Sequence, residues 1–196
     1  MLLKRIISSS LLIGVICAVI FSRFFCGLAA VLFIIGGLYE YFSMLEKKGI
    51  NIYKYFGIGM GIIIPLSIMF KFEPTKSWEL LFIVLALLFL ILMQFKRRKN
   101  SGVIVDISTT LFGILYVSWF FSFVIKLRYM DAGFGFLIAL LLITKLGDIG
   151  AYLVGSNFGK HPLIPRISPN KTIEGAFGGL FFSVIGALAG KIFLGF

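Results

Sequence analysis

An aspartate stands near the end of a long apolar run, where a charged side chain is costly. This residue, Asp148, has glycines at positions 147 and 150 beside it. Ionisable residues inside apolar, membrane-spanning runs usually mark functional sites. Seven residues separate Asp148 from Gly155, which places the carboxylate roughly 10 Å below the end of the run at 1.5 Å per residue. A carboxylate at that depth needs a cation. Either a metal ion or Lys145, three residues earlier on the same helix face, supplies it.

A polar loop is predicted after this run, at 156–172. Gly159, together with Gly155 just before the loop, permits tight turns, and three prolines stiffen the path. It ends with Ser168, Lys171 and Thr172, which offer hydroxyls and an ammonium beside the N–H groups of the next helix. That combination favours phosphate. The loop lacks the Gly-x-x-x-x-Gly-Lys-Ser/Thr pattern of a Walker A loop.

Three further ionisable residues need an interpretation, and each of the two glutamates has two. Glu40 lies near the end of the second apolar run, and it either joins the site or extends to the membrane surface. Glu174 falls in a first helical turn, where it either acts in the site or only complements the helix dipole, with Thr172 as the N-cap. His161 is the only histidine. One histidine makes no metal site, so we interpret His161 as a surface loop residue.

The elements that must position these residues are long apolar segments. The chain is 60% hydrophobic and 14% charged, whereas soluble domains carry about 45–50% apolar and about 25% charged residues. Seven segments are predicted as membrane spans: about 6–22, 24–45, 55–70, 78–95, 103–125, 132–155 and 175–194. We therefore expect an all-α, multi-pass transmembrane helix bundle of about seven spans, forming a single domain over residues 1–196.

The formal charge is +11, and the Lys and Arg residues form short clusters between apolar blocks. Such clusters set the membrane topology and contact anionic lipid headgroups, so we favour this interpretation over nucleic-acid binding. With a cytoplasmic N-terminus, 12 basic residues fall inside and 5 outside. This orientation places the 156–172 loop in the cytoplasm, where nucleotides are found. Cys17 and Cys26 make neither a metal spacing nor a disulfide framework.

Three short motifs carry a family resemblance. They are Gly-Asp-Ile-Gly-Ala-Tyr at 147–152, Gly-Ser-Asn-Phe-Gly-Lys-His at 155–161 and Ile-Ser-Pro-Asn-Lys-Thr-Ile-Glu-Gly at 167–175. In this order and spacing the chain resembles the phosphatidate cytidylyltransferases, also called CDP-diacylglycerol synthases. Weaker similarity extends back to the N-terminus, so the resemblance covers nearly all 196 residues.

The resemblance implies a Mg²⁺-dependent CTP:phosphatidate cytidylyltransferase of phospholipid biosynthesis, in a cell membrane such as the bacterial inner membrane. A phosphatidate oxygen would attack the α-phosphorus of CTP, giving CDP-diacylglycerol and pyrophosphate. The implied catalytic residues are Asp148, which holds the metal, Lys171, and Glu174, which orients Lys171 or a second cation. The implied substrate-binding residues are Tyr152, Asn157, Lys160, Ser168, Lys171 and Thr172.

The chain departs from the family pattern after the third motif. The family's further signature, with a Ser, a Lys-Arg pair, a Lys-Asp pair and a His-Gly-Gly-type turn, does not follow. We therefore expect the chain to match the N-terminal two-thirds to three-quarters of such an enzyme and to make little product alone. A homodimer or a complementing C-terminal fragment would be its protein partner. Two alternatives stay open: a CTP-dependent lipid kinase, and a non-catalytic membrane remnant or lipid-binding scaffold.

Overall fold

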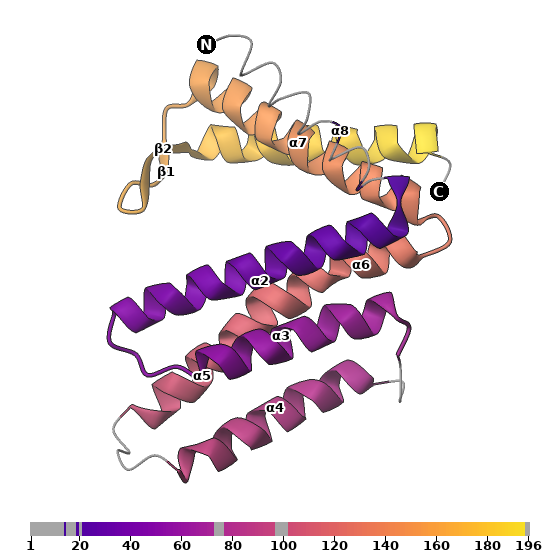
Figure 1. The fold of residues 1–196 in the computed structure, drawn as a ribbon. Helices are drawn as coiled ribbons and strands as arrows, with labels where there is room; N and C mark the ends of the chain where they lie inside the picture. Colours follow the sequence, from indigo (N-terminus) through magenta and orange to yellow (C-terminus); the bar gives the residue numbers. More distant parts are fainter. Residues whose placement is uncertain (1–13, 15–18, 20, 73–76, 97–101, 195–196) are drawn as a thin grey trace, which may run out of the picture. The chain divides into compact units, whose positions relative to one another are not determined.

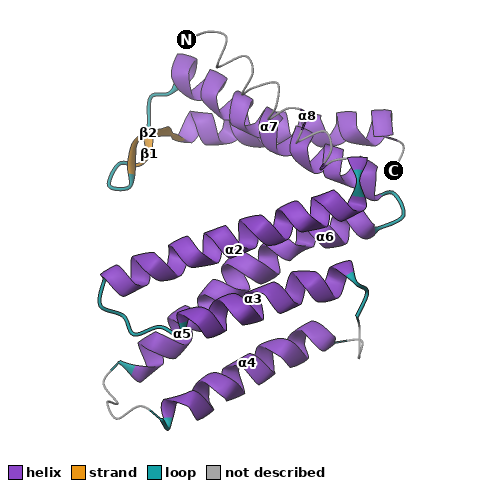
Figure 2. Cartoon of the chain, viewed as in Figure 1, coloured by secondary structure: helices purple, strands orange, loops and turns teal. Residues whose placement is uncertain are grey.

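The described part of the chain is mostly helical. The computed structural model describes residues 14, 19, 21–72, 77–96 and 102–194. They fold as helices and one small strand pair, in two compact units that divide between Tyr129 and Met130 (Figure 1). Figure 2 shows the strand pair at one end of the α7–α8 helix pair.

Among its described residues, the first unit contains four long helical stretches. They are α2 (Arg23–Lys47), α3 (Lys54–Met69), α4 (Trp78–Gln94) and a continuous helix made of α5 (Val103–Gly113), η1 (Ile114–Trp119) and α6 (Phe120–Tyr129). Ser22 caps α2, since its Oγ accepts a hydrogen bond from the Phe25 N–H at 3.4 Å. Gly49 follows α2 with φ +79°, a conformation that favours glycine.

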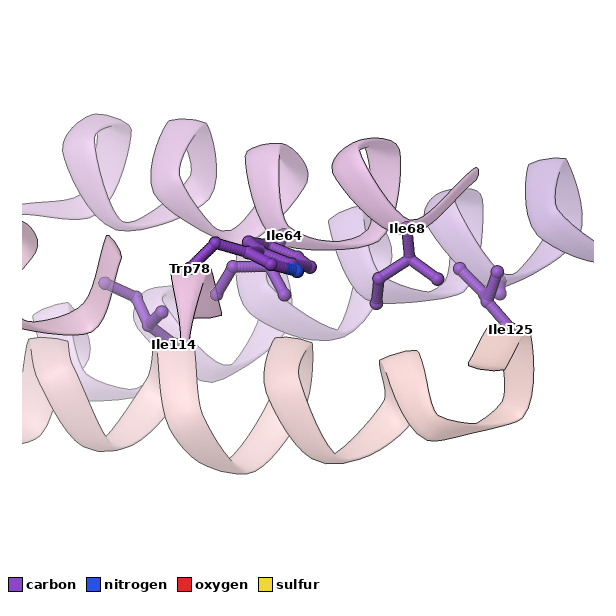
Figure 3. Packing of buried hydrophobic residues seen from close by; sticks show 6 residues of the cluster. Ile64, Ile68, Trp78, Ile114 and Ile125 are labelled. Atoms are coloured by element: carbon purple, nitrogen blue, oxygen red, sulfur yellow. The ribbon is translucent and has the colours of Figure 1, made fainter. Parts of the chain in front are cut away.

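Apolar side chains from several helices form the core of this unit. Figure 3 shows Ile64 and Ile68 of α3 close to Trp78, Ile114 and Ile125. Ser118 is fully buried, and its hydroxyl donates to the Gly61 carbonyl at 2.5 Å. Hydrogen bonds and close packing hold helices together in lipid, where apolar burial gives little drive.

Charged side chains of the first unit are also paired. The Glu79 carboxylate of α4 accepts a hydrogen bond from the Trp119 indole at 2.6 Å and forms an ion pair with Lys126. Asp106 is buried, and its Oδ1 accepts from the Asn51 N–H at 3.2 Å. These contacts tie α4 and the α2–α3 connection to the 103–129 helix.

The second unit is a helix hairpin. Its elements are α7 (Gly133–Phe158), β1 (Pro162–Ile164), β2 (Ser168–Thr172) and α8 (Ile173–Leu194). The strands are antiparallel, with Pro162 opposite Thr172 and Ile164 opposite Ser168. The predicted loop at 156–172 therefore needs correction: α7 continues to Phe158, and most of the remainder pairs as two strands. The fold is helical with a small β-hairpin rather than strictly all-α.

Small residues allow α7 and α8 to approach closely. They face one another in three antiparallel pairs: Gly147 with Ser183, Ala151 with Gly179, and Gly155 with Gly175. A Cβ added to Gly175 would lie 3.1 Å from the Gly155 Cα and 3.0 Å from the Ala151 carbonyl oxygen. The spacing of four residues on both helices is the small-xxx-small pattern of close membrane helix pairs.

Six of the seven predicted segments coincide with helices. The first, 6–22, lies almost wholly outside the described residues. Within the described residues, four helices are long and apolar enough to cross a membrane: Arg23–Lys47, Val103–Tyr129, Gly133–Phe158 and Ile173–Ile192. Helices α3 and α4 are apolar but shorter, at 16 and 17 residues. The count of seven spans and the cytoplasmic N-terminus stay predictions.

Candidate active site

A pocket of about 640 Å³ lies where α7, the β-hairpin and the start of α8 meet, entirely within the second unit. Its lining combines one carboxylate, one ammonium, an amide and three hydroxyls with small and apolar residues. The lining residues are Asp148, Ala151, Tyr152, Gly155, Ser156, Leu163, Asn170, Lys171, Thr172, Gly175 and Ala176. Such a mixture of apolar walls and a few polar groups is typical of small-molecule sites.

The Asp148 carboxylate is available for a ligand. Its side chain is 77% exposed, and its distance from the Lys145 Nζ is 4.0 Å, at the outer limit of an ion pair. Lys145 itself is 74% exposed and is not among the pocket-lining residues. The pairing of Lys145 with Asp148 that the sequence suggested is therefore only a loose contact. It leaves the carboxylate oxygens of Asp148 open to another cation.

Lys171 reaches the same pocket from β2. Within the described residues its ammonium has no ion-pair partner. Asp148 and Lys171 therefore both line one pocket. An unpaired ammonium in the same pocket as an open carboxylate can bind a phosphate beside a cation.

Two more of the expected residues line this pocket. Tyr152 lies one helical turn after Asp148 and is 74% exposed. The Thr172 Oγ1 accepts a hydrogen bond from the Gly175 N–H at 3.2 Å, as an N-cap does. That hydrogen bond occupies one lone pair of the hydroxyl and leaves its proton available to a ligand.

Other expected residues lie outside the pocket lining. Ser168 sits at the start of β2, opposite Ile164. The Asn157 amide donates to the Leu153 carbonyl at 2.8 Å, so it caps the end of α7. Lys160 is exposed in the connection between α7 and β1. The roles assigned to these residues from sequence stay predictions. Glu40 is exposed on α2, in the first unit.

Glu174 contacts the α7–β1 connection instead of Lys171. Its Oε2 accepts from the backbone N–H groups of Lys160 and His161 at 3.1 and 3.2 Å, and its Oε1 lies 2.6 Å from the His161 Nδ1. The Ile173 N–H donates to the His161 carbonyl at 2.9 Å. Two N–H groups at the start of α8, those of Ile173 and Gly175, are thus already engaged, although the sequence suggested that such groups bind phosphate.

Sequence reasoning missed Asn170 as a lining residue. It lies between Pro169 and Lys171 in the third motif, and an uncharged amide beside a lysine carries no charge signal of its own. Within the described residues its side-chain amide has no hydrogen-bond partner. The amide can therefore both donate and accept hydrogen bonds with a ligand in the pocket.

The residues present fit one Mg²⁺ ion. Mg²⁺ is usually held by one or two carboxylates, with substrate phosphates and waters filling the other positions. Asp148 supplies one such carboxylate in a pocket wide enough for phosphates. Within the described residues, no three side chains of the His, Cys, Asp and Glu types gather as a complete protein cage.

Among the described residues, the structure thus combines four helices that are long and apolar enough to cross a membrane with a pocket lined by a carboxylate, an ammonium, an amide and hydroxyls. The family model of the cytidylyltransferase family matches residues 3–196. The chain therefore belongs to the cytidylyltransferase family.

Among curated proteins, the chain is similar to three proteins named phosphatidate cytidylyltransferase. That of Staphylococcus aureus (strain COL) is 32% identical over 85% of this chain and 65% of the relative. That of Staphylococcus saprophyticus is 33% identical over the same shares. That of Staphylococcus epidermidis is 31% identical over 78% of this chain and 59% of the relative. The chain thus spans 59–65% of the length of these relatives.

Proposed function

We propose that this chain forms the nucleotide-binding part of a CTP:phosphatidate cytidylyltransferase, which makes CDP-diacylglycerol and pyrophosphate in phospholipid biosynthesis. The observation that carries the proposal is the pocket in which Asp148 and Lys171 meet at the hairpin end of an apolar helix pair. Family membership and the names of the relatives support the same chemistry. A water-soluble nucleotide and a lipid phosphate can meet only at a membrane surface, which is where such a pocket is needed.

The reaction makes one bond and breaks one. An oxygen of the phosphatidate phosphate attacks the α-phosphorus of CTP, and the bond from that phosphorus to the bridging oxygen of the β-phosphate breaks. Pyrophosphate leaves with that oxygen. Since several phosphate charges must come together, positioning and charge neutralisation carry most of the catalysis.

The pocket residues divide this work. The Lys171 ammonium binds a CTP phosphate, and the Thr172 hydroxyl donates to a neighbouring phosphate oxygen. Asn170 and Tyr152 bind the cytosine, by hydrogen bonding and by stacking. The remaining sequence-derived candidates, Ser168, Asn157 and Lys160, would contact outer parts of the substrates only if the hairpin moves on binding.

Asp148 would hold a Mg²⁺ ion together with the phosphates. The ion would neutralise negative charge on oxygens of the attacked α-phosphate and of the leaving pyrophosphate. This role requires an ionised Asp148 carboxylate that points into the pocket and is not held in a tight ion pair with Lys145. The distance of 4.0 Å between the Lys145 Nζ and the Asp148 carboxylate meets the last condition. A second cation is compatible with the proposal, but no further lining carboxylate is present among the described residues.

We further propose a multi-pass location in the cell membrane, with the N-terminus and the β-hairpin on the cytoplasmic side. The support is the apolar length of four helices and the distribution of basic residues. CTP is present on that side, so the pocket would face its nucleotide. Phosphatidate would enter from the cytoplasmic leaflet.

By itself, this chain should turn over slowly. Displacement at a phosphorus with two charged partners usually uses metal ions at both the attacking and leaving oxygens. Among the described residues Asp148 alone brings a carboxylate to the pocket. We propose that a second copy of the chain or a further protein segment supplies additional carboxylates, as a homodimer or a complementing fragment would.

The test uses purified chain in detergent with Mg²⁺, phosphatidate and CTP labelled at either the α- or the γ-phosphate. The proposal expects CTP binding that weakens in Lys171→Ala, and label from the α-position in any lipid product. Lipid labelled only from the γ-position would show a lipid kinase instead. Binding of phosphatidate with no CTP binding would favour the lipid-binding scaffold, and the proposal would fail.

A further inference from the structure

His161, the only histidine of the chain, makes a short contact with Glu174 beside the pocket hairpin. Its Nδ1 lies 2.6 Å from the Glu174 Oε1, while the other carboxylate oxygen accepts from the backbone N–H groups of Lys160 and His161. The Ile173 N–H donates back to the His161 carbonyl. One carboxylate thus binds three donors of a connection that precedes it by 13 or 14 residues.

These contacts lie next to the strands that carry the pocket residues. His161 immediately precedes β1, and Glu174 lies two residues after β2 ends at Thr172. Pro162 and Thr172, the neighbours of the contact on each strand, are register partners. The contact therefore closes the base of the hairpin, while Asn170 and Lys171 line the pocket a few residues along β2.

We propose that His161 and Glu174 are positioning residues, a latch that fixes the β-hairpin so that Lys171 and Asn170 face the pocket. The effect on nucleotide binding rests on the proposed function, whereas the latch itself does not. Glu174 is then neither a partner of Lys171 nor a cation ligand, and His161 is more than a surface residue. Fixing a binding group in advance lowers the ordering cost of binding.

The latch makes a specific demand on the imidazole. A carboxylate only accepts hydrogen bonds, so the His161 Nδ1 must carry a proton in both the charged and the neutral ring. In the neutral ring this leaves Nε2 without a proton, which is the reverse of the tautomer that histidine prefers in water. Because the chain has one histidine, its ring nitrogen signals report on this contact alone.

The first measurement is ¹⁵N NMR of tag-free, histidine-labelled protein in detergent micelles at a pH where the ring is neutral. The latch predicts a proton on Nδ1 in the wild type and a shift toward Nε2 in Glu174→Ala. A wild-type ring with its proton on Nε2 would overturn the proposal. Backbone exchange measured by mass spectrometry should rise roughly tenfold at residues 160 and 161 in Glu174→Ala, because these N–H groups lose their acceptor.

The second measurement links the latch to the pocket. We expect CTP affinity to fall about tenfold in His161→Ala and in Glu174→Ala, and to recover most of the loss in His161→Asn, whose amide can donate from the place of Nδ1. Ile167→Ala is the matched control, since this side chain is exposed at the hairpin tip and only its backbone N–H bonds to Ile164.

The outcomes separate the latch from the proposed function. If the wild type binds no CTP, the proposed function fails, and exchange at residues 170–172 still decides whether the latch holds the hairpin. Faster exchange there in both latch variants but not in Ile167→Ala supports it. The positioning role is refuted if exchange at residues 170–172 is unchanged in Glu174→Ala. It is also refuted if the wild type binds CTP well and the two latch variants bind it equally well.

Discussion

Gly178→Ala should separate α7 from α8, because the added methyl has no space. A Cβ at this position would lie 2.5 Å from the Val154 Cβ and 2.9 Å from the Gly150 carbonyl oxygen. Carbon atoms pack best at about 3.5–4.0 Å, so the contact with Val154 is about 1 Å too short. Both obstructing atoms are backbone or attached directly to it, so no side-chain rotation relieves the clash.

The size of the effect follows from two opposing terms. Alanine in place of glycine favours a helix by roughly 0.5–1 kcal/mol. Overpacking a close contact costs typically about 1–3 kcal/mol. We expect a net loss of about 1–2 kcal/mol, which is a factor of roughly 5–30 in the equilibrium between folded and unfolded chain.

The assay is unfolding by SDS in mixed detergent micelles, followed by circular dichroism. Gly36→Ala on α2 is the control, because no heavy atom lies within 4 Å of a Cβ added there. Gly178→Ala should unfold at a lower SDS fraction than the wild type, and Gly36→Ala should not. A Gly178→Ala protein at least as stable as the wild type would refute the close packing of the two helices.

Three more outcomes are expected. Lys160→Cys, in a background without other cysteines, should react with an impermeant thiol reagent only after cells are opened; rapid labelling of intact cells would contradict the cytoplasmic hairpin. Asp148→Asn should abolish the Mg²⁺-dependent part of CTP binding, measured by titration calorimetry with and without Mg²⁺, while an unchanged Mg²⁺ effect would exclude Asp148 as the metal ligand. Glu79→Gln should cost about 1–3 kcal/mol through the loss of its charged contacts with Trp119 and Lys126; a wild-type SDS midpoint would argue against that network.

Hydropathy predicted the helices well because each long apolar block has to satisfy its own backbone groups. The segment predicted at 55–70 is Lys54–Met69, and that at 78–95 is Trp78–Gln94. The errors occur where polar side chains extend a helix. The 103–125 segment continues to Tyr129, since Lys126 pairs with Glu79 of another helix.

Part of the site could also be predicted from the sequence. Asp148 and Lys171 stood out by charge and by their place beside apolar runs, and the structure puts both in one pocket. The roles of Glu174 and His161 depend on which backbone groups lie opposite them once the hairpin closes. That closure is a non-local event that neither apolar periodicity nor the local spacing of charges reports.

The paired small residues of α7 and α8 also constrain how this chain can change in length. Gly147, Ala151 and Gly155 meet Ser183, Gly179 and Gly175 in strict reverse order. One residue inserted within either run would rotate everything beyond it by about 100° around the helix axis. Val154 would then take the place of Gly155 on α7, or Phe182 that of Ser183 on α8, so a bulky side chain would face the partner helix. Insertions and deletions in this unit should therefore be tolerated at the hairpin tip, residues 165–167, where the strands reverse and no helix pairing is at stake.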